Sequence, residues 1–160
     1  MQPSFLELPN NNRIAYVLSE GKLPCVIFLG GFKSDMTGTK ATALEESCKK
    51  NGQKFIRFDY TGHGQSSGEF NDGTIGDWKR DALAVIDNLG AEKNILVGSS
   101  MGAWVATLCA IERKEKIYGL VGVASAPDFT EKLVWEQLNA EQKEKLQREG
   151  VYYAPSCYGE

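Results

Sequence analysis

Two runs of the chain, residues 26–29 and 95–97, are continuously apolar and do not alternate between apolar and polar side chains. A strand of this composition has no face turned toward water, so each run predicts a central strand in a sheet that is covered on both sides. Such strands need helices to cover them, and this requirement narrows the folds that the sequence can adopt.

The segments around these runs alternate between strand patterns and helix patterns. Each predicted strand is bounded by Gly, Pro or Asn, as strands commonly are. The predicted strands cover residues 13–18, 25–29, 55–59, 94–98 and 118–124. Helical patterns cover residues 37–51, 74–89 and 101–112, and they predict helices there. From Phe55 onward the predicted strands alternate with these helices. The order predicts an α/β fold with a mostly parallel sheet and helices on both faces.

The pattern changes after Pro127. Asp128 with Glu131, and Asn139 with Gln142, each have the spacing of a capping box, which predicts two short helices. The second helix is nearly all polar and should end at Gly150. We therefore divide the chain into a core of residues 1–128 and a helical cap segment of residues 129–160. Two interpretations fit the pattern of the cap segment: a helix pair on the surface that covers a functional site, and an ordinary terminal helix.

The composition excludes several classes of function. The chain has 160 residues, 42% hydrophobic and 24% charged, which is typical of one compact domain. Its formal net charge of -3 provides no basic patch for a nucleic acid. No apolar run approaches the length of a membrane span, and the first nine residues do not resemble an export signal. These features predict a cytoplasmic protein with neither a nucleic-acid partner nor a membrane span.

The four cysteines, Cys25, Cys48, Cys109 and Cys157, are scattered without close pairs. This spacing argues against a disulfide framework and against a zinc ribbon. The sequence contains one histidine, His63, which cannot form an ordinary zinc set with dispersed cysteines. We predict reduced thiols, no metal site and no cofactor.

Residues 98–102, Gly-Ser-Ser-Met-Gly, fit the pattern G-x-S-x-G between a short apolar strand and an Ala-rich helix. In such a turn the serine is held on a strained connection, and the flanking glycines leave room where a Cβ would collide with the neighbouring chain. Of the two serines in this motif, only Ser100 has a glycine two places away on each side, so Ser100 is the predicted nucleophile and Ser99 should point inward. The alternative is an ordinary glycine-rich turn that happens to contain a serine.

A nucleophilic serine also needs amide hydrogens directed at the oxyanion that forms during acyl transfer, each worth about 3 to 4 kcal/mol. The N–H of Met101 lies at the predicted start of a helix, where unpaired amides and the helix dipole favour negative charge. The N–H of Phe32 follows Gly30 and Gly31 at the end of a central strand. We predict that these two amides form the oxyanion hole.

A third glycine cluster covers residues 59–68 and contains His63. The spacing of Gly62, Gly64 and Gly68 is one residue too long for a dinucleotide fingerprint, and no helix start follows it. His63 could be a catalytic base, but it precedes Ser100, whereas the base of this type of fold follows the serine. A structural turn is the favoured interpretation.

These segments together resemble the α/β-hydrolase superfamily. More narrowly they resemble its acyl-protein thioesterase branch, which includes a mitochondrial palmitoyl-protein thioesterase, an acyl-glucuronide esterase and bacterial relatives. The resemblance covers nearly all of the chain and is carried by residues 30–36, 58–60, 97–102 and 122–124. It implies a serine esterase or thioesterase with Ser100 as nucleophile and the amides of Phe32 and Met101 as oxyanion hole. The implied substrate is a small-molecule ester or acyl thioester.

The family's catalytic acid and histidine follow two further strands, whereas this sequence ends at Glu160. We therefore expect a fold truncated before its last strands and an isolated chain that is almost inactive. Asp128 is the nearest candidate for the acid, but its spacing favours a helix cap. The alternative function is a non-catalytic fragment that serves as an interaction or assembly module. In either case the strand at 118–124 would be an edge, which predicts self-association or a complementary chain.

Overall fold

The computed structural model describes residues 2–9 and 11–151, which fall into two compact units, residues 1–127 and residues 128–160. The first unit contains the sheet, and the described part of the second contains only helical segments. Whether residues 129–160 act as a cap stays a prediction.

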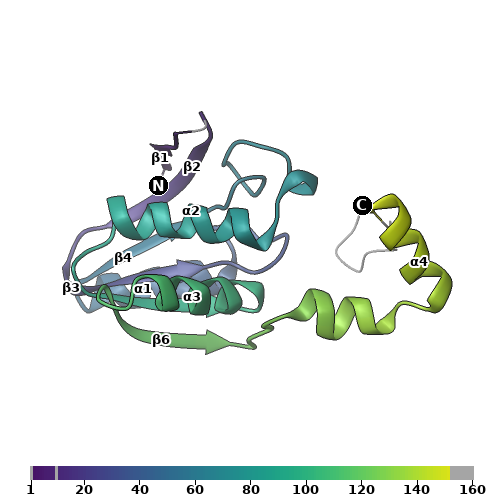
Figure 1. The fold of residues 1–160 in the computed structure, drawn as a ribbon. Helices are drawn as coiled ribbons and strands as arrows, with labels where there is room; N and C mark the ends of the chain where they lie inside the picture. The colour runs from purple at the N-terminus through teal and green to yellow at the C-terminus, as the bar shows by residue number, and fades with distance from the viewer. Residues whose placement is uncertain (1, 10, 152–160) are drawn as a thin grey trace. The chain divides into compact units, whose positions relative to one another are not determined.

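The first unit is built on a sheet of six strands in the order β1-β2-β4-β3-β5-β6 (Figure 1). The strands are β1 (Ser4–Glu7), β2 (Arg13–Ser19), β3 (Lys22–Leu29), β4 (Gln53–Phe58), β5 (Asn94–Ser99) and β6 (Ile117–Val123). β2 pairs antiparallel with β1 and β4, whereas the pairs β4–β3, β3–β5 and β5–β6 are parallel. The predicted α/β fold with a mostly parallel sheet is confirmed.

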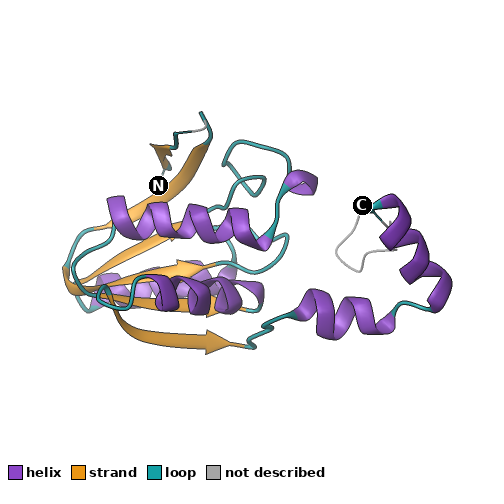
Figure 2. Cartoon of the chain, in the orientation of Figure 1, coloured by secondary structure: helices purple, strands orange, loops and turns teal. Residues whose placement is uncertain are grey.

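Helices cover both faces of this sheet, as Figure 2 shows: α2 and α3 lie on the near face and α1 on the far face. Their bounds are α1 (Thr39–Lys50), α2 (Ile75–Asn88) and α3 (Met101–Glu112). A short 3-10 helix, η1 (Phe70–Asp72), precedes α2. Thr74 and Asp77 cap the start of α2 reciprocally, which satisfies two amides that have no partner within the helix. The predicted helices at 37–51, 74–89 and 101–112 are therefore confirmed within two residues.

The second unit contains the π-helix η2 (Thr130–Val134), the 3-10 helix η3 (Trp135–Gln137) and α4 (Ala140–Glu149). Asn139 and Gln142 form the predicted capping box of α4, and Gly150 ends it with a left-handed backbone at φ 75°. The capping box predicted at Asp128 is wrong. Asp128 has φ 53°, and its backbone carbonyl, not its carboxylate, accepts the amide hydrogens of Glu131 and Lys132.

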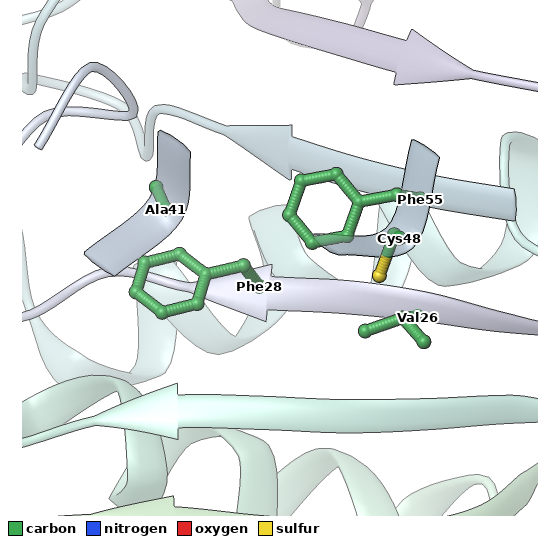
Figure 3. Packing of buried hydrophobic residues seen from close by; sticks show 5 residues of the cluster. All are labelled: Val26, Phe28, Ala41, Cys48 and Phe55. Carbon is green, nitrogen blue, oxygen red and sulfur yellow. The ribbon is translucent and has the colours of Figure 1, made fainter. Parts of the chain in front are cut away.

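The side chains of β3 alternate between the two faces of the sheet, so both faces are apolar, as its continuous run predicts. Toward α1, Val26 and Phe28 of β3 and Phe55 of β4 pack with Ala41 and Cys48 (Figure 3). All five side chains are buried. This packing fixes the helix that follows the loop after β3.

Truncating Phe55 should therefore destabilise the protein. Phe55 is fully buried, so Phe55→Ala removes a large apolar side chain and leaves a cavity, at a cost of about 3–5 kcal/mol in the free energy of unfolding. Urea denaturation measures the change. The matched control is Phe5→Ala, because Phe5 is 41% exposed on β1 and should cost about 1 kcal/mol or less. Equal losses in the two variants would contradict this description of the core.

Candidate active site

Ser100 occupies the connection between β5 and α3 with φ 54° and ψ -119°. A positive φ is unfavourable for a residue with a side chain and costs about 1–3 kcal/mol, so surrounding contacts must hold it. The Ser100 N–H donates to the carbonyl of Val123 at 2.9 Å, and the Ser100 carbonyl accepts from Ala103 and Ala126 at 3.0 and 3.3 Å. Ser100 is half-buried, whereas Ser99 is 8% exposed, which agrees with the inward position predicted for it.

The glycines on either side of Ser100 lie where a side chain would not fit. A Cβ on Gly98 would collide with the backbone of Ala103, and a Cβ on Gly102 would collide with the carbonyl oxygens of Leu29 and Gly30. The first turn of α3 therefore packs directly on the end of β3. The close approach explains why the motif has glycine at both positions.

The end of β3 also comes close to the serine. A Cβ built on Gly31 would lie 3.5 Å from the Cβ of Ser100 and 3.3 Å from the carbonyl oxygen of Ser99. The structure thus brings the Gly30–Gly31–Phe32 turn and the start of α3 together beside Ser100. Phe32 is half-buried and Met101 is buried. An acyl carbonyl at Ser100 would have backbone from both segments next to it.

We call residues 30–36 the oxyanion loop, after the role that the sequence predicts for the amide of Phe32. Its far end is fixed by two buried charged groups. The Met36 N–H donates to Oδ1 of Asp59 at 2.6 Å, and the Met36 carbonyl accepts from Nη1 of Arg57 at 2.8 Å. Oδ2 of Asp59 accepts the N–H of Gln65 at 2.8 Å. Burial raises the pKa of Asp59, although these amide hydrogen bonds act in the opposite direction.

The Arg57 guanidinium is itself neutralised in the interior. Its Nε donates to Oε2 of Glu45 at 2.8 Å, while Oε1 of Glu45 receives hydrogen bonds from Ser19 and Lys49. Burial of Glu45 opposes ionisation, but the hydrogen bonds from Lys49 and Arg57 outweigh it and lower the pKa of Glu45. This network joins β2, α1, β4 and the oxyanion loop.

His63 is 4% exposed, and within residues 2–9 and 11–151 its imidazole contacts aromatic rings and the carbonyl oxygen of Thr61 but makes no hydrogen bond with Ser100. Burial lowers the pKa of His63, against a smaller opposing effect of the Thr61 carbonyl. These contacts favour the structural interpretation of His63 over a base for Ser100. Asp128 belongs to the second unit, and as a catalytic acid it stays the less favoured of the two roles that the sequence suggests.

The described thiols are buried and poorly nucleophilic. Cys25, Cys48 and Cys109 are free, and Cys157 lies outside the described residues. Burial raises the pKa of both Cys25 and Cys109 to about 12, so their thiolates are scarce at neutral pH. Across residues 2–9 and 11–151, no three His, Cys, Asp or Glu side chains gather in a way that could hold a metal ion. No helix in the same ranges is long and apolar enough to cross a bilayer.

The profile of the alpha/beta hydrolase fold family matches residues 24–157. The chain belongs to the alpha/beta hydrolase fold family. Among similar proteins, the mitochondrial palmitoyl-protein thioesterase ABHD10 of Bos taurus is 45% identical over 98% of the chain, and so is that of Homo sapiens. The matched region covers 51% of each relative, so the chain spans about half the length of the curated relatives it matches.

Solved structures of hydrolases are similar over the same region. Mouse alpha/beta hydrolase domain-containing protein 10 superposes with a TM-score of 0.90 and 39% identity, covering 99% of this chain and 63% of its own. A putative hydrolase from Agrobacterium vitis S4 superposes with a TM-score of 0.89 and 38% identity, covering 99% and 65%. These matches confirm the fold and the resemblance to the palmitoyl-protein thioesterase branch.

The predicted cytoplasmic location is wrong, because the names of the similar thioesterases place them in mitochondria. The prediction rested on composition and on the lack of a long apolar run. Neither property distinguishes one aqueous compartment of a cell from another.

The packing of Gly102 can be tested against a glycine at the equivalent helical position. We expect Gly102→Ala to destabilise the protein by about 1–3 kcal/mol, because the added methyl meets backbone carbonyls that cannot move aside. In contrast, the methyl of Gly76→Ala at the second residue of α2 would lie 3.5 Å from Oγ1 of Thr74 and 4.0 Å from Nη1 of Arg80, which are ordinary contact distances. It should stabilise the fold by up to about 1 kcal/mol through helix propensity. Chemical denaturation of both variants gives the two signs, and a stabilising Gly102→Ala would refute the close approach.

Proposed function

We propose that the chain supplies the nucleophile and the oxyanion hole of a serine hydrolase that cleaves carboxylic esters or thioesters. The observation that carries this proposal is the backbone at Ser100, which is strained, half-buried and next to both Gly31 and the start of α3. Strained non-glycine residues of this kind persist where the surrounding structure holds them, and they concentrate at functional sites. Ser100 is the proposed nucleophile, and the amides of Phe32 and Met101 are the proposed oxyanion donors.

In the proposed reaction the Ser100 oxygen attacks the acyl carbonyl carbon, and the negative charge that forms on the carbonyl oxygen is bound by the two amides. The bond from the carbonyl carbon to the leaving oxygen or sulfur then breaks, and the serine proton passes to that leaving group. Water hydrolyses the resulting acyl-enzyme and restores Ser100. No cofactor takes part in these steps.

The proton transfers need a base that residues 2–9 and 11–151 do not bring to Ser100. His63 is the only histidine in the chain, and its described contacts lie with aromatic rings. We propose that the imidazole and its acid partner come from sequence beyond these residues, and that the chain by itself is a slow catalyst. The names of the similar ABHD10 proteins point to a fatty acyl thioester of a protein as the substrate.

A fluorophosphonate probe tests the assignment of the nucleophile. We expect slow formation of a covalent adduct on Ser100, located by peptide mass spectrometry, because the oxyanion site is present but the serine lacks an activating base. The adduct should be lost in Ser100→Ala and retained in Ser99→Ala, which removes the neighbouring buried hydroxyl. An adduct at another residue, or equal labelling of Ser100→Ala, would refute the role of Ser100.

A non-catalytic module is the second candidate, favoured by the exposure of β6. This edge strand contains no charged residue and no proline, and its apolar side chains on both faces are exposed, with Leu120 at 45% and Val121 at 48%. Uncharged edges of this kind invite pairing with another strand. On this hypothesis the edge binds another chain, and the turn at Ser100 serves only the fold.

Sedimentation velocity tests the association of β6. We expect the wild-type chain to form oligomers in a concentration-dependent manner and Val121→Lys to shift it toward monomer, because a lysine on the edge opposes pairing. The control Ile111→Lys places the same charge at a 62% exposed residue of α3 and should leave association unchanged. A wild-type chain that stays monomeric over the whole concentration range would contradict this second function.

A further inference from the structure

Four rings that come from four separate segments pack together beside the oxyanion loop. We call them the Phe70 cluster: Phe32 of the loop, His63 of the turn after β4, Phe70 of η1 and Trp78 of α2. The centroid of Phe70 lies 5.0 Å from that of Phe32 and 5.0 Å from that of His63, both edge-to-face. His63 lies 5.1 Å from Trp78, which in turn lies 6.1 Å from Phe32. Phe32 is therefore held by rings that His63 supports from behind.

Hydrogen bonding fixes the state of the imidazole in this cluster. Nδ1 of His63 lies 3.3 Å from the carbonyl oxygen of Thr61, and a carbonyl can only accept, so Nδ1 carries the hydrogen. The same carbonyl accepts from Nε1 of Trp78 at 3.1 Å, which orients both rings on one atom. Nε2 of His63 is buried and has no hydrogen-bond partner among the described residues. This nitrogen suits a neutral imidazole, because a proton on it would be a buried donor without an acceptor.

The ionisable groups on the elements around His63 do not change this conclusion. They include Lys33 and Asp35 of the oxyanion loop, Asp59 and Tyr60 of the turn, Glu69 and Asp72 at η1, and Asp77, Arg80 and Asp81 in the first half of α2. Asp59 accepts hydrogen bonds from Met36 and Gln65, and Asp81 accepts from Thr61, so both carboxylates are engaged elsewhere. Lys33 is a cation, with its Nζ 5.5 Å above the ring of Phe70.

We propose that neutral His63 is a positioning residue for the oxyanion loop: it supports Phe70 and Trp78 against Phe32, and its protonation loosens the loop. The proposal rests on the proposed function only for its catalytic meaning, since Phe32 supplies one of the two proposed oxyanion amides. The physical coupling from His63 to Phe32 depends on the packing alone.

The sign of the pH effect follows from burial. Burial lowers the pKa of His63 below its ordinary value of 6.5, so the folded cluster favours the neutral ring. The stability that this preference gives is fully present above the ordinary pKa and is lost as the pH falls through the pKa of the folded state. Opening of the loop should therefore become more frequent under mildly acidic conditions. The open fraction should rise by about tenfold for each pH unit by which the pKa of His63 in the folded cluster lies below its ordinary value.

Amide hydrogen exchange measures this opening directly. We expect amides of residues 31–36, after correction for intrinsic pH dependence, to exchange faster as the pH falls below 6.5. The midpoint should match the titration of the imidazole signals, which are assigned without ambiguity because the chain has one histidine. Exchange in β3 and β5 should not show this step. Ser100→Ala should behave like the wild-type chain, so the result is independent of whether Ser100 is a nucleophile.

Two substitutions distinguish the contribution of His63 to this pH effect from that of other titratable groups. His63→Phe keeps a ring in the cluster but cannot titrate, so the step should disappear while protection at neutral pH stays near that of the wild-type chain. His63→Ala removes the ring and should increase exchange of the loop at every pH. A step that persists in His63→Phe would assign the effect to Asp59 and overturn the proposal. A wild-type chain without a step, or an imidazole midpoint at or above 6.5, would overturn it as well.

Discussion

The buried carboxylate of Asp59 fixes two segments that are distant in the sequence. It accepts the N–H of Met36 at 2.6 Å and the N–H of Gln65 at 2.8 Å, and the lack of a side chain on Gly64 lets that turn lie directly against it. A buried carboxylate without such donors would cost several kcal/mol, so neither segment can leave without exposing or stranding the charge. The oxyanion loop and the turn that contains His63 are therefore held to the end of β4 together.

Much of this arrangement can be predicted from the sequence because its signals are local. The apolar runs in β3 and β5 predict the central strands, and the glycines around Ser100 predict the turn, since each depends on neighbours within a few residues. β1 is not predicted, because its four residues, Ser4–Glu7, make a very short and mostly exposed strand that is recognisable only from its pairing with β2. The capping box at Asp128 was wrong because a left-handed backbone there directs the carbonyl, and not the side chain, to the amides.

The part of the site that sequence reasoning missed is the support of the oxyanion loop. Residues 32, 63, 70 and 78 follow no common spacing, and the contacts among them arise only when the loop, the turn, η1 and α2 meet. Likewise, nothing in the sequence distinguishes Arg57 and Glu45 from other charged residues of a strand and a helix. Their ion pair at 2.8 Å becomes visible only once α1 packs beside β4. Contacts between segments that are distant in the sequence cannot be predicted from composition or from local residue spacing.

The two ends of the oxyanion loop are held by interactions of different kind, and this difference has a consequence for the site. Met36 is held by charged groups, whose directional hydrogen bonds fix its peptide in register with β4. Phe32 is held by ring packing, which is weaker per contact and less directional. Strain at Ser100 can persist only if the backbone beside it stays in place, and Gly31, which lies next to Ser100, directly precedes the Phe32 anchor. The Phe32 end of the loop should therefore detach before the Met36 end, and the Phe32 end is the one nearest Ser100.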